Sequence, residues 1–135
     1  MVQWIMVAVL SIHVLTAVFW AGSTFVVART NGLGADLLFR PQMAAATIAV
    51  LSGGYLWNLL HEGSFGLTEK ILAGAAASAI VAMVVQGWLI GRSLVALRRQ
   101  AVDQTALRSR IAFAYRAAAF LLAATVVGMA AARYA

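Results

Sequence analysis

The chain has 135 residues, of which 64% are hydrophobic and 10% are charged, and its mean hydropathy is +0.92. A soluble domain is about half apolar and about a quarter charged, so this composition excludes a soluble fold and predicts a membrane protein. Because the chain has no cysteine, disulfides, thiolate nucleophiles and metal–thiolate sites are excluded as well.

Four long apolar stretches lie between clusters of charge, and each has about the 20 residues that a helix needs to cross a bilayer. Unbroken, alanine-rich runs favour helices over the alternating strands of a membrane barrel. We therefore predict one transmembrane domain over residues 1–135, an all-α integral membrane four-helix bundle. The expected spans are residues 3–28, 41–60, 70–91 and 111–132.

His13 lies in the first stretch, at a position that the hydrocarbon of the bilayer would surround. It lies roughly 13 Å inward from Trp4, near the middle of a bilayer. Ala17 and Trp20 continue the same helix face, and this mixture of small and aromatic side chains suits a bundle interior or a flat cofactor. A neutral imidazole there can ligate a heme iron, bind a metal, relay protons or form a hydrogen bond between helices.

The second stretch begins at Pro41, which is expected in the first turn of a helix. Its Ser52-Gly53-Gly54 run permits close approach of another helix or of a macrocycle. His61 follows at the outer end, beside Glu62, and this pair is either part of a shallow metal site or a solvated loop pair.

The third stretch is where a second ligand at the depth of His13 is expected. Counting about thirteen residues inward from Glu69 reaches Met83, with Gln86 a turn further, whereas Lys70 lies near the outer surface. Neither a Ser/His/Asp set nor a phosphate loop occurs in the sequence, which excludes hydrolase and kinase chemistry and leaves redox, transport or assembly.

The formal net charge of +6 comes from ten basic and four acidic residues, and the basic ones are unevenly distributed. Eight arginines fall in or beside the loops that follow the first and third stretches, whereas Lys70 and Arg133 fall on the other side. By the positive-inside rule, we expect a bacterial inner-membrane protein with both termini in the periplasm and the basic loops in the cytoplasm.

The favoured interpretation of the basic loop at residues 92–110 is that its arginines determine this membrane topology. Binding of anionic lipid headgroups or of an acidic partner is the alternative. Nucleic acid is not an expected partner, because no aromatic residue is interleaved with these arginines.

Residues 12–22 resemble the opening helix of the CopD-like membrane proteins and the related HemJ proteins. The shared pattern is Ile12-His13, an apolar turn and then Trp20-x-Gly22. Weaker similarities extend over most of residues 3–132, at Arg40-Pro41, Ser52 to Trp57, Lys70, Gly91-Arg92 and Tyr115-Arg116.

This resemblance implies either a b-type heme held in a four-helix bundle or copper handling, with His13 and Lys70 as the histidine and the lysine of the family. HemJ proteins oxidise protoporphyrinogen and carry an Asn-Glu-x-Pro-like stretch in the fourth helix. Residues 117–119 of this chain are alanines at that place, which argues against that particular oxidation.

The leading hypothesis is a heme-b-binding membrane protein in electron transfer or porphyrin-related oxidation, an oxidoreductase. Its expected cofactor-binding residues are His13, Trp20, Lys70 and Met83. The first alternative is a copper-handling permease component, with His13 and His61 as ligands and Met6 and Met83 as soft donors. The second is a cofactorless accessory subunit, whose partners are other membrane subunits or further copies of the chain.

Overall fold

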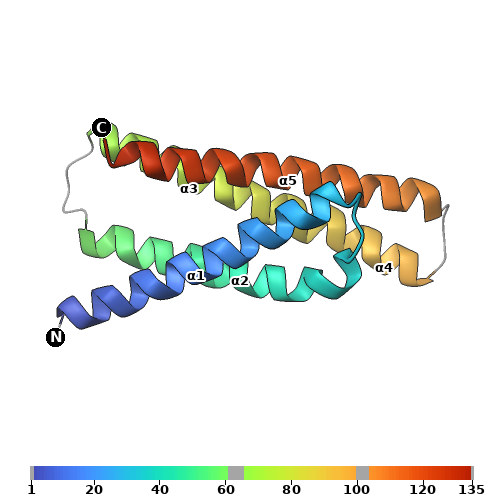
Figure 1. The fold of residues 1–135 in the computed structure, drawn as a ribbon, viewed down its shortest axis with the longest axis horizontal. Helices are drawn as coiled ribbons and strands as arrows, with labels where there is room; N and C mark the ends of the chain where they lie inside the picture. The colour runs from blue at the N-terminus through green and yellow to red at the C-terminus, as the bar shows by residue number, and fades with distance from the viewer. Residues whose placement is uncertain (1, 61–65, 100–103, 135) are drawn as a thin grey trace.

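The computed structural model describes residues 2–60, 66–99 and 104–134, and within them the chain is an all-α bundle of four long helices (Figure 1). The helices are α1 (Val2–Arg29), α2 (Ala35–Leu60), α3 (Leu67–Val85), the π-helical turn η1 (Gln86–Ile90), α4 (Gly91–Arg99) and α5 (Gln104–Ala132). α3, η1 and α4 form one continuous helix of 33 residues. The predicted fold class is therefore confirmed.

The outer surface of the bundle is apolar. In the described part of the chain, three helices are long and apolar enough to cross a membrane, namely Val2–Arg29, Leu67–Arg99 and Thr105–Ala132. Leu15, Phe113 and Phe120 are each at least 70% exposed, whereas the buried core consists mostly of alanine. Large apolar side chains turned outward around a small-residue core suit a lipid surrounding. That α2 also crosses the membrane stays a prediction.

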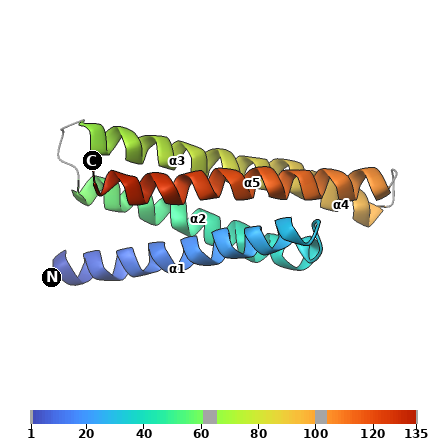
Figure 2. The ribbon, with the colours of Figure 1, turned by 45° about the horizontal axis from the view of Figure 1, so that its top comes forward.

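The helices pack as two pairs, α1 with α2 and α3 with α5. Small residues allow the close approach, since a methyl group at Gly128 of α5 would lie 3.1 Å from the Cβ atom of Ala75 in α3. α1 crosses α5 near its own C-terminal end and diverges from it toward the end of the bundle where both termini lie (Figures 1 and 2). The two pairs are therefore closely joined at one end and separated at the other.

Three helix boundaries differ by six or more residues from the sequence-based expectation, and one of them is the start of α5, at Gln104 rather than at residue 111. α2 begins at Ala35 rather than at Pro41, because Asn31, Gly32 and Gly34 adopt positive φ angles of 56°, 84° and 84° and reverse the chain directly after α1. Pro41 thus lies inside the helix, where its missing N–H removes one helical hydrogen bond. The long helix that begins at Leu67 continues beyond Gly91 to Arg99, through η1.

Candidate cofactor site at His13

A cavity of about 420 Å³ opens between the two helix pairs in the half of the bundle nearest the termini. All four long helices line it. The lining residues are His13, Ala17, Trp20 and Ala21 of α1; Ala49, Val50, Gly53, Gly54, Leu56 and Trp57 of α2; Leu72, Ala76, Ala79 and Ile80 of α3; and Leu122, Thr125, Val126 and Met129 of α5. Small-molecule and cofactor sites occupy about 300–1,000 Å³ and have mostly apolar walls with a few polar groups, so this cavity is of that kind.

The imidazole of His13 is held on α2 through one of its two nitrogens. Nδ1 lies 2.9 Å from the backbone oxygen of Ala49 and 3.1 Å from Oγ of Ser52. A carbonyl oxygen only accepts hydrogen bonds, so Nδ1 carries the proton and donates to Ala49. The Ser52 hydroxyl donates to the backbone oxygen of Ile48 at 2.6 Å, which leaves its lone pairs for the imidazole. The neutral ring therefore has its free lone pair on Nε2.

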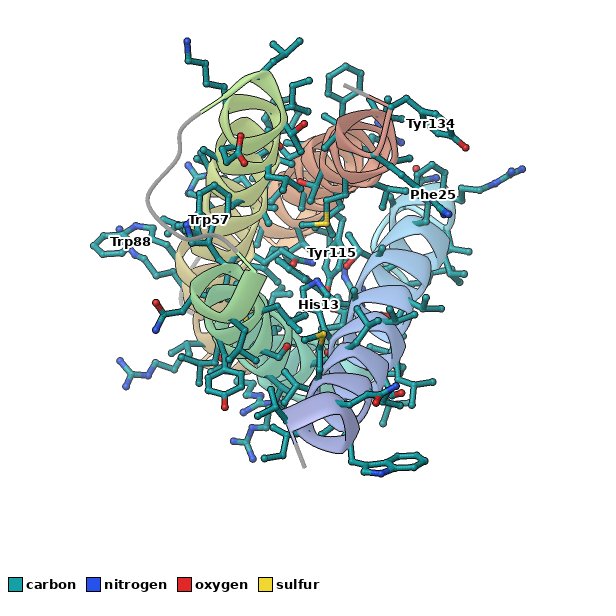
Figure 3. All side chains as sticks on the ribbon, turned by 90° about the vertical axis from the view of Figure 1, so that its left-hand side faces the viewer. His13, Phe25, Trp57, Trp88, Tyr115 and Tyr134 are labelled. Atoms are coloured by element: carbon teal, nitrogen blue, oxygen red, sulfur yellow. The ribbon has the colours of Figure 1, made fainter. Side chains whose placement is uncertain are left out.

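Nε2 of His13 has no hydrogen-bond partner among residues 2–60, 66–99 and 104–134. Every fully buried side-chain nitrogen or oxygen in these ranges has a partner, so Nε2 is not fully buried, and His13 is one of the residues that line the cavity. Figure 3, a view along the bundle from the end with the termini, shows His13 turned inward between the helices. Metal-ligating histidines commonly donate their other ring N–H to a backbone carbonyl, and His13 has this arrangement.

Gly53 makes room for the imidazole. A Cβ atom at this position would lie 3.0 Å from Cε1 and 3.4 Å from Nδ1 of His13, whereas a Cβ atom at Gly54 would meet nothing within 4 Å. The Ser52-Gly53-Gly54 run predicted to permit a close approach therefore does so at Gly53, and the approaching group is the ring of His13.

Trp20 lies at the inner end of the cavity and is 2% exposed. Its indole Nε1 donates to Oε1 of Gln86, and Nε2 of Gln86 donates to Oγ1 of Thr24 at 2.9 Å. Gln86 is fully buried and is the first residue of η1. The π-helical turn thus begins at the side chain that fixes the Trp20 ring, and π-helical turns often occur at functional sites.

The structure brings together two of the four predicted cofactor-binding residues, His13 and Trp20. Met83 packs partly buried against the alanines of the core, one turn beyond the cavity-lining Ala79 and Ile80. Lys70 is exposed in the first turn of α3 and does not line the cavity. His61, predicted as a metal ligand with His13, lies outside the described residues.

Met129 lines the cavity opposite α1 and was missed by the sequence reasoning. Met129 follows Thr125 by four residues, so the two share one face of α5, and this spacing is the pattern in the sequence that could have identified it. The second ligand was sought only in the third apolar stretch. Sequence reasoning placed Met83 at the depth of His13, but α3 faces the cavity with Ala76, Ala79 and Ile80 instead.

The donor set of the cavity is sparse, because the described residues contain no group of three or more His, Cys, Asp or Glu side chains able to hold a metal ion. Among the described residues, the cavity lining has no carboxylate that would act as an acid or a base. Its described residues supply the imidazole of His13, the thioether of Met129, the hydroxyl of Thr125 and a large apolar wall. In comparisons with known proteins, no family model, no curated protein and no solved structure matches this chain.

Proposed function

We propose that this protein is an integral membrane, heme-b-binding protein that acts in electron transfer or in porphyrin-related oxidation. One observation carries the proposal: His13 lines an apolar cavity between four helices, its Nδ1 donates to the Ala49 carbonyl, and its Nε2 has no partner among the described residues. A neutral imidazole with its second nitrogen fixed by a carbonyl is a usual axial ligand of heme iron.

The residues around the cavity fit a flat apolar group. Gly53 and Gly54 leave the α2 wall without side chains beside His13, and Trp20 presents an aromatic ring held by Gln86. The described lining is mostly apolar, and Met129, whose thioether is a known heme ligand, lines the same cavity as His13. Heme supplies reversible one-electron chemistry when bound, whereas the chain orients it and sets its surroundings.

The test is the absorption spectrum of the detergent-purified protein, oxidised and reduced, before and after addition of hemin. We expect a Soret band that the His13→Ala variant loses or shifts to that of free hemin. Met83→Ala is the matched control, because Met83 does not line the cavity and its variant should keep the spectrum. If the wild type takes up no hemin, or His13→Ala binds hemin as the wild type does, heme ligation by His13 is wrong.

Copper handling is the second candidate, because the imidazole of His13 and the thioether of Met129 line the same cavity and both are ligands for copper. A lone ion needs several donors, and the described lining offers few, so the large apolar cavity favours heme. Metal analysis of the purified protein separates the two: stoichiometric copper without a Soret band would replace heme by copper.

For the orientation, we propose that the arginine-rich end of the bundle lies in the cytoplasm of a bacterial cell and both termini in the periplasm. The chain has no cysteine, so single cysteines report accessibility without a background. An impermeant thiol reagent added outside should label Leu67→Cys and leave Ala106→Cys unlabelled, both positions being exposed. Labelling of Ala106→Cys alone would reverse the orientation.

A further inference from the structure

A second hollow lies at the opposite end of the molecule from His13, between the α4 segment and the beginning of α5. It is a groove of about 620 Å³ lined by Leu89, Arg92, Ser93, Ala96, Leu107, Ser109, Arg110 and Phe113. These residues are of three types: two arginines, two serines that carry hydroxyl groups, and four apolar residues. None of the described lining residues is acidic.

The groove lies where a membrane-crossing helix leaves the hydrocarbon. The continuous helix Leu67–Arg99 has 33 residues. At 1.5 Å per residue such a helix spans about 50 Å, and the hydrocarbon core is about 30 Å thick, so its ends extend among the lipid headgroups. Trp88, one residue before the groove, is 62% exposed and points outward (Figure 3). Exposed tryptophans of this kind mark the membrane interface.

The two arginines come from facing helices. The Arg92 guanidinium lies 5.7 Å from the centroid of the Trp88 ring, which holds it at the level of the interface. Arg110 lies on α5 and is exposed. Guanidinium groups donate paired hydrogen bonds to phosphate oxygens, and hydroxyls such as that of Ser109 add a further donor.

The apolar side chains of the groove point to the second half of the ligand. Leu89 and Phe113 are 47% and 70% exposed and lie on the membrane side of Arg92 and Arg110 along their helices. An acyl chain fits against them while its phosphate meets the arginines. From these positions, we propose that the groove binds an anionic phospholipid, with Arg92 and Arg110 on the phosphate.

The test compares two pairs of arginines that carry the same charge. Purified full-length protein is mixed with equal amounts of phosphatidylglycerol and phosphatidylcholine in detergent, and the retained lipids are counted by native mass spectrometry. The wild type should retain phosphatidylglycerol preferentially, by about fivefold or more. Arg92→Gln/Arg110→Gln should lose this preference, and Arg98→Gln/Arg99→Gln, outside the groove, should keep most of it.

Equal losses in the two double variants would show a diffuse charge effect and overturn the proposal, as would a preference that survives in Arg92→Gln/Arg110→Gln. Displacement of the lipid by inorganic phosphate alone would assign the groove to a free anion instead. If the double variant does not fold, Arg110→Gln alone should still lower the preference, and an unchanged preference contradicts the site.

A second measurement locates the lipid. Phosphatidylglycerol brominated on its acyl chains should quench the Trp88 component of the fluorescence more than brominated phosphatidylcholine does at the same mole fraction. Trp88→Phe identifies that component by difference. Equal quenching by the two lipids would place the retained phosphatidylglycerol elsewhere and overturn the assignment.

Discussion

The two ends of the bundle treat buried polar side chains differently. At the arginine-rich end, the Tyr115 hydroxyl donates to Gln42, and Gln42 donates to Oγ of Ser23 at 3.1 Å. Tyr115 and Gln42 are fully buried, and the helices around them are closely packed. At the end with the termini, His13 lines a cavity, and of its two ring nitrogens only Nδ1 has a partner among the described residues.

This difference indicates which buried polar residues of a membrane helix are structural and which are candidates for a functional role. A buried polar group costs free energy unless it is paired, and the polar atoms of Gln42, Gln86 and Tyr115 have partners within the bundle. Those side chains join helices. His13 has one paired ring nitrogen and lines a cavity, and this combination is what supports the proposed heme site.

The largest effect on stability is expected at Gln86, midway between the two ends. Gln86→Leu leaves Nε1 of Trp20 without an acceptor in a fully buried place and should lower the free energy of unfolding by about 2 kcal/mol. Unfolding in mixed micelles with increasing dodecyl sulfate measures this. Gln3→Leu, at an exposed position of α1, is the matched control, and an equally small effect in both variants would refute the structural role of Gln86.

A change at Gly53 should act on binding instead. Gly53→Ala places a methyl group 3.0 Å from Cε1 of His13, so the imidazole must shift and its bond to Ala49 weakens. We expect the dissociation constant for hemin to rise about tenfold, equivalent to about 1.4 kcal/mol. Gly22→Ala, which meets nothing within 4 Å and does not line the cavity, should leave hemin binding unchanged. If both variants bind hemin equally well, the contact of His13 with Gly53 is irrelevant to the site.

A smaller effect is expected where Tyr115 donates to Gln42. Tyr115→Phe removes one hydrogen bond between membrane helices and should cost about 1 kcal/mol of stability, with hemin binding unchanged because Tyr115 does not line the cavity. Tyr55→Phe is the control, since Tyr55 is 47% exposed. A loss of hemin binding in Tyr115→Phe would contradict the division between the two ends.

The fold was largely predictable because bilayer thickness sets the length of each apolar stretch. The predicted four helices are present, and most of the charged residues lie near their ends. The start of α2 was not predictable from Pro41 alone. The chain reverses because Asn31, Gly32 and Gly34 adopt positive φ angles. The sequence of this segment predicts a turn, but it does not fix the residue at which the next helix begins.

The site was predictable only in part. His13 and Trp20 are conspicuous in an apolar helix, and both line the cavity. Met129 was missed, and Met83 does not line the cavity, because counting residues along a helix gives a level and not the face that the cavity meets. α1 crosses α5 and diverges from it. The number of residues from the end of a helix therefore does not give the position of a side chain relative to the neighbouring helices.

The smallest effect is expected at Ser52, and it decides which atom sets the tautomer of His13. The Ala49 carbonyl lies 2.9 Å from Nδ1 and is present whatever the side chain at position 52, so Ser52→Ala leaves the main acceptor in place. We expect the hemin dissociation constant to rise by at most about threefold, with the same Soret position as the wild type. If Ser52→Ala instead abolishes the Soret band as His13→Ala does, the hydroxyl and not the carbonyl orients the imidazole. Oγ of Ser52 would then be the acceptor that holds Nδ1–H, and without it the ring would no longer keep the lone pair of Nε2 in place for the iron.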